Sequence, residues 1–130
     1  MIRRNTDFLK RNNYASLGMP VGPYVHFIRH GDTLYLSGLT AYGTKGQGKG
    51  MSDQIGATFQ QIERICQSEG TALSNIIKVT LYVTDMGQLA ELRQSLFEVY
   101  GDHIPASSLV RVESLFSSEV DIEIEAIIAL

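Results

Sequence analysis

The sequence has little of several residue types, and each shortage excludes a class of protein. It contains one cysteine, Cys66, so disulfides within the chain cannot hold the fold together. It has no apolar run of the length that a membrane-spanning helix needs, and its basic N-terminus lacks the apolar segment of a secretory signal. Charged residues make up only 19% of the chain and the formal net charge is −3, which argues against a broad nucleic-acid-binding surface.

What remains is the composition of an ordinary globular domain. The chain has 130 residues, of which 44% are hydrophobic, and a chain of this length can bury a real core. We therefore predict a cytoplasmic protein without a membrane segment. We expect an N-terminal arm over residues 1–20, weakly ordered or extended, and one domain over residues 21–130.

Alternating hydrophobic residues predict strands, which arrive mostly in adjacent pairs. Two strands lie within residues 23–39, around a Gly31-Asp32 turn. A third covers 76–85, where alternation places Ile77 on the core face and Ile76 on the opposite face. Two more strands, over about 107–113 and 120–129, finish the chain.

Two stretches have helical periodicity. Over residues 52–69 the apolar side chains recur at helical spacing; Ser52 or Asp53 is placed to cap the start, and Gly70 to end the helix. The second helix is expected after Asp85, where Gln88 follows three residues later as in a capping box, and Gly101 closes it.

The resulting order, β-β-α-β-α-β-β, predicts an α+β fold in which one sheet carries two helices on one face. The opposite face of the last strand mixes carboxylates with apolar residues: Asp121, Glu123, Glu125, Ile127 and Ala129. A sheet face in water should be more polar than this, so we expect another subunit to cover it.

Two patterns that could indicate a bound phosphate group or metal do not hold in this sequence. Residues 43–50 read GTKGQGKG and nearly match a phosphate-binding P-loop, but Gly50 stands where a Ser or Thr must hold the metal. A loop joining the hairpin to the helix is the better interpretation. The three histidines, His26, His30 and His103, have no metal-ligand spacing. We therefore predict no metal and no cofactor.

Several short motifs, in order along the chain, resemble the RidA/YjgF family of reactive-intermediate deaminases. They are Gly22-Pro23-Tyr24, Leu36-Ser37-Gly38, Ile77-Lys78-Val79-Thr80 with Val83-Thr84-Asp85, Pro105-Ala106-Ser107-Ser108, and Ile122-Glu123-Ile124-Glu125-Ala126. The similarity covers about residues 20–130. It implies a chorismate-mutase-like fold with one mainly antiparallel mixed sheet. It also implies a homotrimer with clefts between subunits, and cofactor-free hydrolysis of 2-imino acids to 2-oxo acids and ammonia.

The resemblance also implies roles for particular residues. Tyr24 would wall the cleft, Ser37 and Gly38 would line it, and Glu123 would hold the attacking water. The backbone near Leu109 would contact the nitrogen end of the substrate. A structural interpretation stays open for two of these residues: Tyr24 as an ordinary interface aromatic, and Glu123 as a charge paired with a lysine or arginine.

The sequence departs from the family where its deaminases read Pro-Ala-Arg-Ser. Here Ser107 stands in place of that arginine, beside Ser108, and Leu109 replaces the usual cysteine. A hydrogen bond to a charged group contributes roughly 1.5–3 kcal/mol, so losing the carboxylate anchor costs activity. Arg111 shares a strand face with position 107 but lies about 13 Å further along. Arg93 is a second candidate cation, across an interface.

Three functions follow from these residues. The first is hydrolysis of a reactive imine or enamine with an altered substrate range. The alternative is a non-enzymatic trimer whose clefts bind a small metabolite. A weaker alternative is an RNA-directed activity, as endoribonuclease or translation inhibitor; the net charge of −3 argues against it, and we do not expect nucleic acid as a partner.

Overall fold

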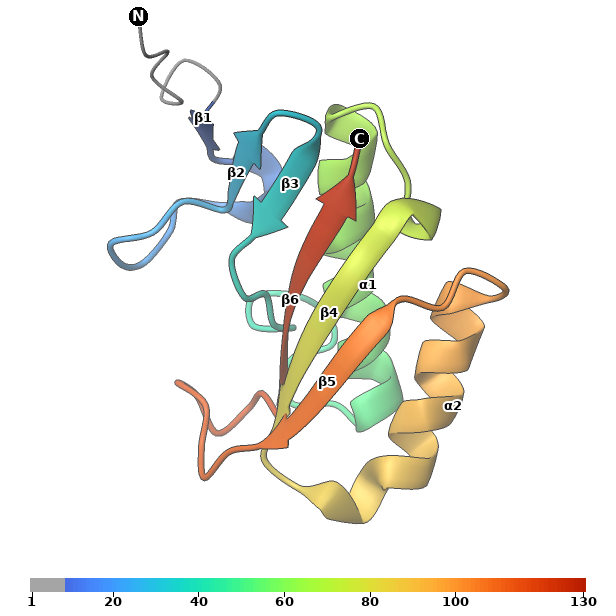
Figure 1. The fold of residues 1–130 in the computed structure, drawn as a ribbon. Coiled ribbons are helices and arrows are strands. Elements are labelled where there is room, and N and C mark those ends of the chain that lie inside the picture. The colour runs from blue at the N-terminus through green and yellow to red at the C-terminus, as the bar shows by residue number, and fades with distance from the viewer. Residues whose placement is uncertain (1–8) are drawn as a thin grey trace, which may run out of the picture.

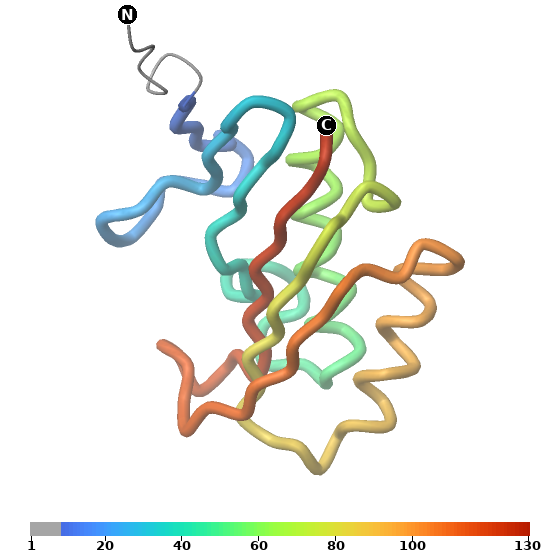
Figure 2. Tube along the Cα trace, in the orientation of Figure 1, coloured from blue at the N-terminus to red at the C-terminus, as the bar shows by residue number. Residues whose placement is uncertain are grey.

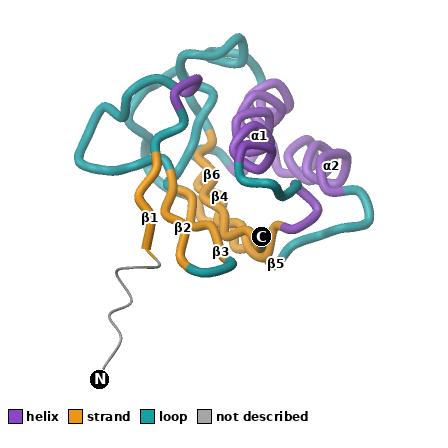
Figure 3. The backbone as a smooth tube through the Cα atoms, turned by 90° about the horizontal axis from the view of Figure 1, so that it is seen from above, coloured by secondary structure: helices purple, strands orange, loops and turns teal. Residues whose placement is uncertain are grey.

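The computed structural model describes residues 9–130 and has two layers, a six-stranded sheet and two helices on one of its faces (Figure 1, Figure 3). The strands follow the order β1-β2-β3-β6-β4-β5 across the sheet. Their bounds are Leu9–Asn12 for β1, Phe27–His30 for β2, Thr33–Leu36 for β3, Ile76–Val83 for β4, Ala106–Arg111 for β5 and Ile122–Ala129 for β6. Only β4 and β5 pair in parallel; the other neighbours are antiparallel. The predicted chorismate-mutase-like α+β fold is confirmed.

The first helix, α1, spans Met51–Ser68 and packs its apolar stripe on the sheet. Neither Ser52 nor Asp53 caps it, contrary to the prediction. Its N-cap is Gly50, which offers no side chain, and the free N–H of Ser52 instead donates to Glu91 Oε1, on the second helix, at 3.2 Å. The other end is as predicted, because Gly70 directly after the C-cap adopts a φ of +77° that favours glycine.

The second helix, α2, spans Leu89–Tyr100 and begins later than predicted. Asp85 does accept a hydrogen bond at an N-cap, from the N–H of Gly87 at 2.8 Å, but it caps the short 3-10 turn Met86–Gln88. Gln88 is then the N-cap of α2 and makes no capping bond. The capping box was therefore a wrong prediction, since an intervening turn separates the Asp from the helix.

Strand β4 contains an irregularity that reverses one predicted pair of faces. Its register with β6 shifts between Ile76 and Lys78, as in a β-bulge. Ile76 is consequently buried, at 6% exposure, and Ile77 is 49% exposed, the opposite of what strict alternation predicts. From Val79 onward the alternation holds, and Val79, Leu81 and Val83 lie in the core.

The expected arm, predicted as weakly ordered or extended, supplies a strand that the predicted order β-β-α-β-α-β-β lacks. Residues 9–12 pair along β2 as an edge strand, and Figure 2 shows this segment at the opposite edge of the sheet from β5. Two hydrogen bonds fasten the next residues: the His26 N–H donates to Asn13 Oδ1 at 3.1 Å, and the Tyr14 N–H donates to His26 Nδ1 at 2.9 Å. Residues 1–8 of the predicted arm lie outside the described residues.

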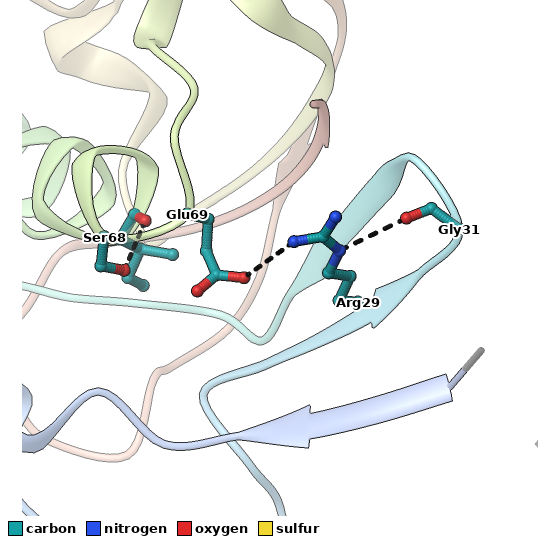
Figure 4. A network of polar contacts seen from close by, with 5 residues as sticks. Arg29, Gly31, Ser68 and Glu69 are labelled. Atoms are coloured by element: carbon teal, nitrogen blue, oxygen red, sulfur yellow. Dashed lines mark hydrogen bonds and ion pairs between the residues drawn. The ribbon is translucent and has the colours of Figure 1, made fainter. Parts of the chain in front are cut away.

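A peripheral contact links the β2–β3 hairpin to the end of α1 (Figure 4). Arg29 Nη1 lies 3.9 Å from Glu69 Oε1, and Arg29 Nε donates to the Gly31 carbonyl at 3.4 Å. An exposed ion pair of this kind contributes at most about 1 kcal/mol, so the hairpin is positioned chiefly by its core residues, such as Leu34. Within residues 9–130, no helix has the length and apolarity to cross a bilayer.

Candidate active-site cleft

A cleft of about 780 Å³ lies where three parts of the chain meet. The segment before β2 supplies Tyr24, the chain after β3 supplies Ser37 and Gly38, and β6 supplies Glu123. Four residues that the sequence named as site candidates therefore line one cavity of a single protomer. This volume is within the range of small-molecule sites.

Ser37 fixes the wall of the cleft next to Tyr24. Its hydroxyl donates to the Val25 carbonyl at 2.6 Å, and its N–H donates to the His26 carbonyl at 3.0 Å. These bonds continue the β2–β3 pairing beyond the strand ends, so the segment carrying Tyr24 runs beside the segment carrying Gly38. The Ser37 hydroxyl is thus engaged in holding the backbone rather than free as a donor.

Gly38 lies directly under the Glu123 side chain, so any side chain at position 38 would displace that carboxylate. A Cβ atom at position 38 would stand 2.6 Å from Glu123 Oε2 and 2.8 Å from Glu123 Cδ, closer than any real contact. The backbone of Gly38 does not have a positive φ, so the reason is close approach and not conformational freedom. The Ser-Gly motif and the glutamate of the last strand are therefore one steric unit.

Glu123 has the properties of a general base. It is half-buried, and among residues 9–130 no donor hydrogen-bonds to its carboxylate and no cation pairs with it. Burial raises the pKa of this carboxyl, and repulsion from the nearby Glu125 raises it further. The alternative that Glu123 is one half of an ion pair with Lys78 or an arginine is wrong for this chain on its own.

The prediction missed Glu125, which also lines the cleft. It lies two residues after Glu123 on the same strand face, so strand alternation could have identified it. Its Oε1 accepts a hydrogen bond from the Tyr82 hydroxyl at 2.9 Å, and this bond is the main reason that the pKa of Tyr82 is raised.

An aromatic pair at the mouth of the cleft was also missed. Tyr42 and Phe116 meet edge to face, with ring centroids 5.2 Å apart and an interplanar angle of 68°. Phe116 comes from the loop between β5 and β6 and Tyr42 from the loop before α1, so no sequence pattern brings them together. Such a pairing is a tertiary contact between irregular segments.

The candidates on β5 lie elsewhere. Between β3 and β5 stand β6 and β4, so Ser107 is on the order of 14 Å across the sheet from the strand that leads to Ser37. Ser107, Leu109 and Arg111 pair with Val79, Leu81 and Val83, and so share the helix-facing side of the sheet. Ser108 pairs with Thr80, which itself pairs with Glu125, and so shares the carboxylate face.

Neither candidate cation reaches the cleft of its own protomer. Arg111 is exposed at the end of the edge strand, and Arg93 is exposed on α2, on the helix side of the sheet. Arg111 does share a face with Ser107, as the strand arithmetic predicts. The described chain thus separates the candidates in the cleft from those on the edge strand β5, and Arg93 on α2 belongs to neither group.

The remaining reactive groups are structural. Cys66 is fully buried in α1, where burial raises the pKa of its thiol to about 11, so it is an inert core thiol. The Nδ1 atom of His26 accepts the Tyr14 N–H, and burial lowers the pKa of this imidazole. Residues 9–130 contain no cluster of three or more potential metal ligands.

Known proteins resemble this chain over nearly its whole length. The model of the family described as Endoribonuclease L-PSP matches residues 16–130. A RutC family protein of Pyrococcus horikoshii is 35% identical over 114 residues, covering 83% of this chain and 87% of that protein. A 2-iminobutanoate/2-iminopropanoate deaminase of Dermatophagoides farinae is 24% identical over 114 residues, covering 85% and 88%. The crystal structure of yeast Mmf1 superposes with a TM-score of 0.82 at 28% identity, over 93% of this chain and 98% of that one.

Proposed function

The chain belongs to the RidA/YjgF family, described also as Endoribonuclease L-PSP, and we propose that it hydrolyses a reactive imine or enamine to a carbonyl compound and ammonia. The observation that carries this proposal is the half-buried Glu123 carboxylate in the cleft, which no group of residues 9–130 engages. A relative at 24% identity is named for the deamination of two small 2-imino acids. The substrate of this chain differs from those, because Ser107 lacks the charge of an arginine.

The reaction needs a base and a water and is balanced by those alone. Water adds to the carbon of the protonated imine while Glu123 takes one of its protons, giving a neutral carbinolamine. Glu123 returns this proton to the nitrogen, and the carbon–nitrogen bond breaks with its electron pair leaving on ammonia. The carbinolamine hydroxyl gives its proton to Glu123 as it becomes the carbonyl, and Glu123 passes that proton to solvent. A carboxyl whose pKa lies above the ordinary value suits both steps, because it accepts and returns a proton near neutral pH more readily than an exposed one.

We also propose that the working form is a homotrimer in which β5 of one subunit closes the cleft of the next. Two features support this. The face that carries Glu125 also exposes large apolar side chains, Tyr35 and Val110. The edge-strand candidates cannot reach the cleft of their own subunit. Size-exclusion chromatography with light scattering should give three times the chain mass; a clean monomer would overturn the proposed assembly.

The activity is tested with imines that an oxidase generates in the assay from amino acids and amines. The release of ammonia and of the carbonyl product is measured. The purified protein should accelerate the hydrolysis of at least one imine, and Glu123→Gln should abolish the acceleration. Glu98→Gln is the matched control, because this exposed residue of α2 lines no described cavity. No rate above buffer for any imine in the wild type would remove the enzymatic function.

One observation favours a second function, binding of a small metabolite without turnover. The position that anchors the substrate carboxylate in the family's deaminases is here an exposed, neutral Ser107. Ligands that raise the melting temperature and are recovered unchanged would support binding alone.

A further inference from the structure

The charges in the cleft are of one sign. Glu123 and Glu125 both line it, and no lysine or arginine side chain does. Arg11 and Lys78 border two adjoining cavities that share Glu125, and within residues 9–130 neither forms an ion pair with either glutamate. A ligand in the cleft therefore meets two carboxylates on one strand face before it meets any cation.

Three aromatic side chains line the cleft together with aliphatic and polar residues, and their rings are open. Tyr24, Tyr42 and Phe116 are between 45% and 64% exposed although each is a large ring, and nothing in the described chain covers them. The edge-to-face contact of Tyr42 with Phe116 fixes the orientation of two of these rings. Ring faces beside carboxylates attract organic cations, since the ring quadrupole and the carboxylate charge act in the same direction.

We propose that the ligand of this cleft is an organic cation without a carboxylate, an amine or a protonated imine derived from one. The proposal rests on the proposed function and names its substrate class. The nitrogen of such a cation would lie between Glu123 and Glu125, and its carbon chain against the aromatic wall. A 2-imino acid would instead bring a third carboxylate to the same place, with Ser107 unable to offset it.

The ionisation of the cleft agrees with this charge preference. The pKa of Glu123 is raised first by burial and then by repulsion from Glu125. A bound cation relieves this repulsion, whereas a bound anion increases it.

Three ligands of matched size test the proposal: n-butylammonium, n-butanol and butanoate, each titrated into the full-length protein by calorimetry. Butylammonium should bind at least about tenfold more tightly than butanoate, with butanol between them, because one hydrogen-bonded charge contact is enough for that ratio. Glu125→Gln should weaken butylammonium about tenfold and leave butanol unchanged, while the remote Glu98→Gln changes neither. Butanoate binding as tightly as butylammonium, or no measurable binding of butylammonium, overturns the proposal.

A second measurement separates this proposal from the proposed function. Hydrolysis is followed for the imine formed by oxidation of propylamine and, in parallel, for 2-iminopropanoate. If the protein prefers butylammonium but hydrolyses neither imine, the proposed enzymatic function is overturned and the proposed cation site is supported. The opposite outcome is faster hydrolysis of 2-iminopropanoate, together with tight butanoate binding that Arg111→Ala abolishes. It would support the enzyme and overturn the cation site, because a neighbouring subunit would then supply the anchor for the carboxylate.

Discussion

The candidate site has two halves, and a single chain completes only one of them. The cleft half comprises Tyr24, Ser37, Gly38 and Glu123, and the edge half comprises the candidates on β5. In the cleft half, Glu123 rests on Gly38 and Ser37 is held by two hydrogen bonds, so the base and its surroundings are complete within a protomer. In the edge half, Ser107 and Ser108 are exposed on the outermost strand and touch nothing that belongs to the cleft. In the proposed mechanism one chain supplies the base, whereas in the proposed trimer recognition depends on what a neighbour brings. A change at position 107 is then expected to alter recognition without disturbing the base.

The largest expected effect comes from removing the base. Glu123→Gln keeps the shape of the side chain over Gly38 but cannot take a proton, so we expect imine hydrolysis to fall by at least about 100-fold. Steady-state ammonia release measures this. A loss of less than threefold would mean that the cleft half does not carry the chemistry, and the comparison of the two halves would fail.

The next effect comes from restoring a cation to the edge half. Ser107→Arg should increase kcat/KM for 2-iminopropanoate by about tenfold to several hundredfold, because a guanidinium can bind the substrate carboxylate in a bidentate pair. Ser68→Arg, at the exposed end of α1, is the matched control, because it adds the same charge at a position that lines no described cavity. Equal gains in both variants would show that added positive charge alone is enough and that the geometry of position 107 is irrelevant.

The fold was predictable because its signals are local and periodic. The stripe Ile55, Phe59, Ile62 identified α1, and the alternation of β6 placed its carboxylates on one face. Two predictions failed, each at a local irregularity of the backbone. The bulge at Ile76 and the short turn after Asp85 each insert residues that no period reveals, because they depend on pairing with β6 and on the approach of α2.

The candidate site was only partly predictable for a related reason. Tyr24, Ser37, Gly38 and Glu123 were identified through the family resemblance, and the cavity brings them together. The reason for Gly38 was not visible, since the overlying Glu123 comes from a strand far along the chain. Phe116 was missed because loops of irregular structure decide its position. The proposed placement of Ser107 and Arg111 against a neighbouring cleft concerns contacts between chains, and a single sequence has no period that encodes such contacts.

A smaller effect tests the steric unit within the cleft half. Gly38→Ala would place a methyl group against the Glu123 carboxyl and push this flexible side chain aside by less than about 1 Å, so we expect kcat to fall about tenfold. Gly56→Ala on α1 is the control, because nothing lies within 4 Å of its added methyl. That change should stabilise the helix by about 0.5–1 kcal/mol and leave kcat unchanged. An unchanged kcat in Gly38→Ala would show that the position of Glu123 over Gly38 is not the reactive one.

The smallest effect concerns stability, and it distinguishes the two halves without any substrate. The folded-state pKa of Glu123 is raised above the ordinary 4.5, so the folded chain holds this proton more tightly than the unfolded chain. The carboxyl therefore favours folding below pH 4.5, and this contribution is lost as the pH rises through the folded-state pKa. Glu123→Gln should accordingly raise the free energy of unfolding at neutral pH, and this advantage should shrink as the pH falls through the folded-state pKa and be absent below 4.5. Urea unfolding at several pH values and one protein concentration measures both.

Ser107→Arg at the exposed edge should show no such dependence, because no buried charge is involved there. If both variants follow the same pH curve, the pKa of Glu123 is not raised in the folded state, and the contrast between the cleft half and the edge half loses its electrostatic basis.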